Sequence, residues 1–139
     1  MGLAEKRAIE GFKTSQYTDF KKQIEGILGA SVEFDIAWDN FSMQLEGRSN
    51  PTEAMSEYMA GMFFQPMIHA FKSICSDDMG KTALRESLKK VQMLNSGNYY
   101  SDSGVTYDSG VLKLDFYYAN VDQVADRETA IRTKIESAL

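Results

Sequence analysis

The sequence holds few of the residue types on which catalytic and metal sites are usually built. Its 139 residues include one cysteine, one histidine and two prolines. The lone Cys75 excludes a disulfide within the chain and fits a reducing cytoplasm. One histidine and one cysteine cannot make a zinc site without carboxylates from distant segments. Glycine-rich phosphate loops and the GxSxG, CxxC and HExxH motifs are also missing. The sequence therefore predicts no cofactor, no metal ion and no catalytic residue.

The chain also lacks the features of a membrane or nucleic-acid protein. No run approaches the ~20 apolar residues that span a bilayer, and the charged N-terminus does not resemble a signal peptide. The net charge is −5, and the lysines and arginines are scattered rather than clustered. A phosphate-backbone binder would need a basic cluster. We expect a cytoplasmic protein without a membrane or nucleic-acid partner.

What the chain does contain is an ordinary globular composition, with 43% hydrophobic and 25% charged residues. Its length predicts one domain over residues 1–139. The segment 61–80 is the most apolar, and its hydrophobic residues recur at helical spacing on more than one face. Asn50 and Glu53 form a capping box ahead of it. Pro66 should then kink this central helix near Gln65, or two helices should meet there.

The remaining pattern predicts an α+β fold. Apolar and polar residues alternate from Val32 to Asp39, which indicates a half-buried antiparallel strand. Residues 41–45 could form a short partner strand, and 91–94 another strand. Residues 105–107 and 111–116 read as a hairpin that turns at 108–110. Helices are predicted over 3–14, 79–89 and 122–138, with a further one that begins near Thr18 and ends before Gly29. Together these elements predict an antiparallel sheet of four or five strands with helices packed mainly on one face.

The predicted sheet gathers several carboxylates. Alternation places Glu33, Asp35 and Asp39 on the face opposite Trp38, and Asp115 of the hairpin could join them. Such a group could hold a divalent cation or a basic partner. The simpler interpretation is the solvated side of a one-sided sheet, and no metal site is predicted.

Three further side chains are candidates for binding. His69 lies on the central helix, where its neighbours offer neither a nucleophile nor an orienting carboxylate. Cys75 is six residues further on and faces another side of that helix. Tyr107 and Tyr117 belong to a tyrosine-rich region, and tyrosine is enriched at interfaces because an apolar ring carries a polar tip.

Four segments carry a resemblance to known sequences: MGLAEKRAIEGF, FFQPMIHAFKSICSDDMGK, YDSGVLKLDF and NVDQVADRETAIRTKIESAL. Together they resemble a family of small uncharacterised bacterial proteins over the full length of the chain. That family has no assigned activity, so the resemblance assigns no functional residue. It implies a stand-alone intracellular bacterial protein.

The sequence thus predicts a small binding or interaction protein that acts through surface complementarity on a protein partner. Inhibitory and immunity-like proteins belong to this class. Whether the protein is a monomer or a homodimer stays open. The alternative is a small-molecule-binding domain or enzyme with a pocket between the sheet and the central helix, with His69 at its edge.

Overall fold

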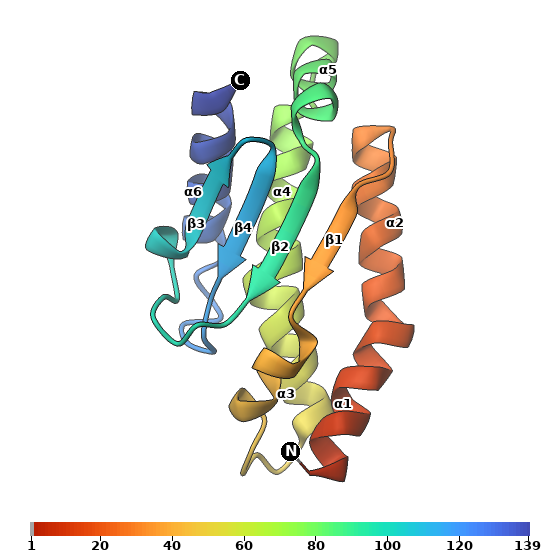
Figure 1. Cartoon of the computed structure of the whole chain (residues 1–139), viewed down its shortest axis with the longest axis vertical. Coiled ribbons are helices and arrows are strands. Elements are labelled where there is room, and N and C mark those ends of the chain that lie inside the picture. The colour runs from red at the N-terminus through yellow and green to blue at the C-terminus, as the bar shows by residue number, and fades with distance from the viewer. Residues whose placement is uncertain (1) are drawn as a thin grey trace.

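The computed structural model describes residues 2–139 and has an α+β fold (Figure 1). The helices of the N-terminal half are α1 (Leu3–Thr14), α2 (Gln16–Leu28) and α3 (Pro51–Tyr58), with the 3-10 helix η1 (Trp38–Gln44) between α2 and α3. A π-helix, η2 (Met59–Phe64), joins α3 to α4 (Gln65–Ile74), and α5 (Asp78–Ser87) follows. The last helices are the short 3-10 turn η3 (Asp102–Gly104) and α6 (Val124–Ala138).

The sheet is mixed, so the prediction of an antiparallel sheet is wrong. Its strands are β1 (Glu33–Ile36), β2 (Lys90–Leu94), β3 (Val105–Asp108) and β4 (Val111–Asp115), in the order β1-β2-β4-β3. β1 and β4 both run parallel to β2, and only β3 and β4 are antiparallel. The reason is connectivity. The helices from α3 to α5 carry the chain back between β1 and β2, and a helical crossover of this kind joins parallel strands. Alternating polarity reports a half-buried strand but not its direction.

The predicted hairpin is confirmed. β3 and β4 pair through Tyr107 and Leu112, and the turn residues Ser109 and Gly110 have φ angles of 52° and 80°. Positive φ at both central residues is the geometry that matches the twist of a two-residue hairpin, and glycine adopts it without steric cost.

The predicted partner strand at residues 41–45 is a 3-10 helix instead. Phe41 and Leu45 are fully buried, whereas Met43 is 73% exposed. In a strand, Met43 would share one face with Phe41 and Leu45, so its exposure between two buried residues excludes a strand. Over so few residues, the same apolar residues fit both a strand pattern and a helical pattern. This ambiguity led to the wrong prediction of a strand at residues 41–45.

The central helix runs through α3, η2 and α4 without a break. Asn50 caps it as predicted, because its Oδ1 accepts the Glu53 N–H at 3.1 Å. The π-helical segment η2 ends at Phe64, two residues before Pro66, where a kink or a break was expected. A proline in an α-helix collides with the carbonyl one turn earlier, and the wider π turn changes the backbone at that point.

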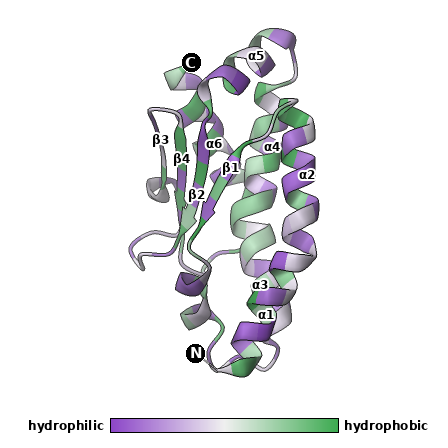
Figure 2. Ribbon diagram, turned by 45° about the vertical axis from the view of Figure 1, so that its right-hand side comes forward, coloured by the Kyte–Doolittle hydropathy of each residue, from purple (hydrophilic) through white to green (hydrophobic). Residues whose placement is uncertain are grey.

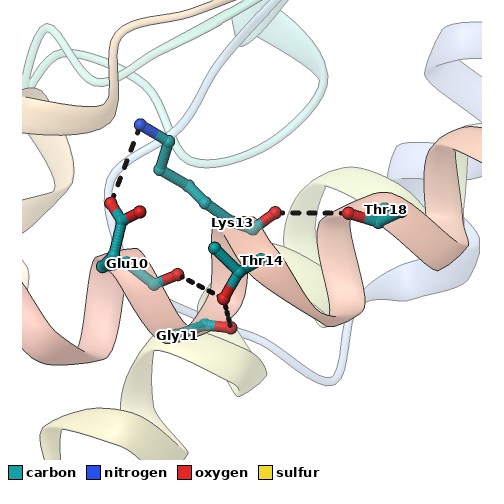
Figure 3. Close-up of polar contacts among 5 residues, drawn as sticks. All are labelled: Glu10, Gly11, Lys13, Thr14 and Thr18. Atoms are coloured by element: carbon teal, nitrogen blue, oxygen red, sulfur yellow. Dashed lines mark hydrogen bonds and ion pairs between the residues drawn. The ribbon is translucent and has the colours of Figure 1, made fainter.

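Helices α1 and α2 meet at Ser15, three residues before the predicted start at Thr18. Side-chain hydroxyls end α1 by binding its own carbonyls: Thr14 Oγ1 donates to Glu10 O at 3.0 Å, and Thr18 Oγ1 donates to Lys13 O at 3.4 Å (Figure 3). Hydroxyls that compete for backbone groups in this way often bend or interrupt helices.

The core lies between the sheet and the central helix. In Figure 1, α4 and α6 lie behind the strands, and in Figure 2 the strands and α4 carry much of the hydrophobic colour. Phe63 packs on Phe116 just beyond β4, with ring centroids 5.1 Å apart, and Phe64 packs on Phe34 of β1 at 6.3 Å. Among residues 2–139, no helix is both long and apolar enough to cross a membrane.

Phe64 joins the helix layer to the sheet, which makes it the sharpest test of this core. Its ring is fully buried and stacks on Phe20 at 5.0 Å. We expect Phe64→Ala to lower the free energy of unfolding by ~3–5 kcal/mol, because it leaves a cavity among aromatic rings. A urea melt measures this loss. Met43→Ala is the control and should stay within ~0.5 kcal/mol of wild type, since Met43 is exposed. Equal stability of the two variants would contradict the core described above.

Candidate functional site

Arg127, on the inward side of α6, is the largest fully buried side chain described. It lies one and two turns before Ile131 and Ile135, which are also buried. Its guanidinium donates to three backbone carbonyls. Tyr100 O accepts from Nε at 3.0 Å and from Nη2 at 2.8 Å, Ala119 O accepts from Nη2 at 2.8 Å, and Asn120 O accepts from Nη1 at 2.9 Å. A buried charge is tolerated only when its hydrogen bonds are satisfied, and here the backbone satisfies them.

Burial lowers the pKa of the Arg127 guanidinium, and the carboxylates of Asp122 and Asp126 act in the opposite direction. The Phe116 ring lies 5.5 Å from the guanidinium carbon and adds a cation–π contact. Because arginine keeps its proton over the whole physiological pH range, its contact with the three carbonyls does not depend on pH.

Arg127 fixes two loops that leave the ends of adjacent strands. One loop follows β2 and carries Tyr99 and Tyr100, and the other follows β4 and reaches Asn120. The loops also bind each other, because Tyr117 N–H donates to Tyr99 O at 2.7 Å. A Cβ on Gly104 would lie 2.1 Å from Asp115 O, so the first loop passes too close to β4 for any other residue.

A groove of about 610 Å³ lies between the first loop and α6. Residues 100–103 form one wall, and the other wall is a flank of α6 that carries Gln123, Asp126, Thr129, Thr133 and Lys134. Most of these side chains are exposed. The groove therefore presents hydroxyls, an amide, carboxylates and one ammonium group on a backbone that Arg127 holds in place.

Tyr100 lines this groove, Tyr99 precedes it in the loop, and Tyr117 packs against it; we call these three residues the tyrosine rim. Tyr99 and Tyr100 are 39% and 38% exposed. The rings of Tyr100 and Tyr117 pack with their centroids 5.4 Å apart. Tyr117, a predicted binding residue, is half-buried and supports the exposed pair.

The predicted acidic residues do not meet in one site. Glu33 and Asp35 lie on one face of β1, where both carboxylates are 3.8 Å from the ammonium group of Lys90. Asp39 is exposed in η1. Asp115 shares the sheet face of Asp35 by register, but it is two residues further along and only 3% exposed. The β2–β3 loop covers it, and Ser96 N–H donates to its Oδ1 at 2.9 Å. No group of three or more metal-ligating side chains occurs within the described chain.

His69 and Tyr107 lie apart from the groove. His69 is exposed on α4, and its Nδ1 is 4.0 Å from a carboxylate oxygen of Glu128 on α6. Tyr107 is half-buried on β3, with its hydroxyl 2.6 Å from Ser87 Oγ at the end of α5. The Tyr107–Ser87 hydrogen bond joins β3 to α5, whereas the His69–Glu128 pair lies at the surface.

The thiol of Cys75 is half-buried at the end of α4. Burial raises its pKa, and Lys81 and Arg85 offset part of that rise. A raised pKa disfavours the thiolate, which is the nucleophilic form. Burial likewise raises the pKa of Tyr58, with Asp115 as a further cause, so its hydroxyl stays protonated and donates to Phe116 O.

Neither Arg127 nor the groove was predicted from the sequence. Ile131 and Ile135 form the apolar stripe of α6, whereas Val124 is only half-buried. A signal was present, because Arg127 precedes Ile131 by four residues and so belongs to the apolar stripe. The groove itself depends on loops whose paths no periodicity reports.

Comparison of the chain with protein-family models, curated proteins and solved structures finds no match in any of the three.

The ammonium group of Lys90 already pairs with both Glu33 and Asp35, so we expect no cation site there. Asp35→Asn should stay within ~0.5 kcal/mol of wild type, because exposed ion pairs contribute little. Millimolar Ca²⁺ or Mn²⁺ should leave the melting temperature unchanged in a thermal scan, and Asp108→Asn, on the exposed end of β3, serves as the control. A rise in melting temperature that Asp35→Asn abolishes and Asp108→Asn preserves would show a metal site.

Proposed function

We propose that this protein is a non-catalytic interaction protein that recognises a protein partner at the tyrosine rim and the adjoining groove. The observation that carries the proposal is the pairing of exposed aromatic rings with an immobilised backbone. Tyr99 and Tyr100 present their rings to solvent, while Arg127 holds the carbonyl of Tyr100 through two hydrogen bonds.

A surface of this kind binds at low entropic cost. Interface hot spots are enriched in tyrosine, tryptophan and arginine. A tyrosine ring offers a large contact area with few rotatable bonds, and a fixed loop loses little freedom on binding. The position also agrees with a general preference, since ligands of sheets with parallel strands bind beyond the strands' carboxyl ends, where both Arg127-bound loops begin.

The alternative, a pocket between the sheet and the central helix with His69 at its edge, has less support. Phe63, Phe71, Met93 and Leu114 fill that space as part of one core, with no exposed surface. His69 lies outside that core and faces Glu128.

The proposal extends to how the helices cover the sheet. We propose that they pack mainly on one face and leave the other to solvent. Two observations support this: the side chains of Glu33 and Asp35 are 69% and 54% exposed, and Figure 1 places α4 and α6 on the far side of the strands. An inhibitory or immunity-like role belongs to the same proposal, and so does the bacterial cytoplasm that the family resemblance implies.

Site-specific photocrosslinking tests the proposed surface directly. We expect a benzophenone amino acid in place of Tyr100 to give a discrete adduct after irradiation in cells of the native host. The same substitution at Met79, which is 82% exposed on α5, is the control and should give none.

The partner identified by mass spectrometry is then purified, and its affinity is measured by calorimetry. Tyr100→Ala should weaken binding by about 30-fold, the size of a hot-spot effect of 2 kcal/mol. Equal adducts at both positions, or unchanged affinity of Tyr100→Ala, would refute the proposed surface.

A further inference from the structure

The groove has one helical wall and one loop wall. Its helical wall runs from Gln123 to Lys134, which corresponds to about 16 Å at the rise of an α-helix. The opposite wall is the loop 100–103. A trough of this length suits an extended chain of about five residues.

The lining can satisfy a peptide backbone. The hydroxyls of Ser103, Thr129 and Thr133 can each donate and accept a hydrogen bond, and the amide of Gln123 can do both as well. The Ser101 hydroxyl donates to Asp102 Oδ1 at 3.1 Å and can still accept. An extended peptide presents N–H and C=O groups in alternation, so it needs both kinds of partner along its length.

The two ends of the helical wall carry charges of opposite sign. Asp126 lies in the first turn of α6 and Lys134 about 12 Å further along the same flank. Asp102 adds a second carboxylate from the opposite wall. The buried Arg127 does not line the groove and makes four hydrogen bonds to backbone carbonyls. Among the lining residues, the carboxylates of Asp102 and Asp126 therefore outnumber the one ammonium group of Lys134.

We infer that the groove binds an extended peptide segment of the partner, with a basic side chain at Asp126 and Asp102 and a carboxylate four residues later at Lys134. This inference rests on the proposed function and adds the chemistry of the partner. The spacing fits, because residues four apart in an extended chain are about 13 Å apart and point to the same side. The exposed face of Tyr100 also suits a guanidinium or ammonium group.

The test uses nuclear magnetic resonance titration of the isotope-labelled full chain with three blocked pentapeptides. The first is Arg-Thr-Ser-Thr-Glu, the second carries Gln at both ends, and the third carries Glu at both ends. We expect the first peptide to shift the amide signals of residues 101–103 and 126–134 and to bind at least about fivefold more tightly than the other two.

Variants show whether the charges act where the inference places them. Asp126→Asn and, separately, Asp102→Asn should each remove most of the preference for the Arg peptide without affecting the Gln peptide. Asp19→Asn, at an exposed position of α2, is the matched control and should change nothing. The amide spectrum of each variant reports whether it is folded.

Three results would overturn the inference: equal affinity for all three peptides, shifts outside the groove, or a preference that survives both variants. A neutral trisaccharide that shifts the same amides when no peptide does would also overturn it, and would assign the groove to a sugar instead. A crosslink at Tyr100 together with a failed peptide test rejects only the peptide chemistry, whereas loss of both rejects the proposed function.

Discussion

The hydrogen bonds from Arg127 to three backbone carbonyls are the constraint on which the candidate site depends. They join the start of α6 to the loops that follow β2 and β4, which lie far apart in sequence. Without them, the carbonyls of Tyr100, Ala119 and Asn120 would lose their charged donor, and a hydrogen bond to a charged group contributes about 1.5–3 kcal/mol. Asn120 adopts a φ of 52°, a left-handed conformation that asparagine tolerates better than most residues. The groove wall and the tyrosine rim are consequences of this anchor.

Much of the fold could be predicted because its signals are local. The capping box at Asn50, the hairpin turn at Ser109 and Gly110, and the buried Phe64 all follow from short-range patterns. Strand direction could not be predicted, because alternation along β1 is the same whether its neighbour runs parallel or antiparallel. The π-helical segment before Pro66 could not be predicted either. The sequence shows that proline disturbs a helix, but the packing around it decides whether the helix kinks, breaks or widens.

The candidate site was predicted only in part. The tyrosine-rich region was identified, yet Tyr107 binds Ser87, and the exposed pair is Tyr99 and Tyr100. Alternation placed Glu33 and Asp35 on one face as the structure does, but it could not show that Lys90 pairs with both. Asp115 has the right register and is nevertheless covered by a loop. In each case, the environment of the side chain is set by a residue or loop from a distant segment. A single sequence does not show which distant segments come into contact.

Amide hydrogen exchange in an Arg127→Met variant tests most directly whether this arginine holds the site together. The reporters are the N–H groups of Tyr117, Gly104 and Gln123, which bind carbonyls within or between the anchored loops. The Gly29 N–H at the end of α2 reports the rest of the fold. The account predicts that the variant speeds exchange of the loop amides at least about tenfold more than exchange at Gly29, a difference of about 1.4 kcal/mol in local opening. Equal acceleration at all four amides, or unchanged protection of the loops, would contradict it.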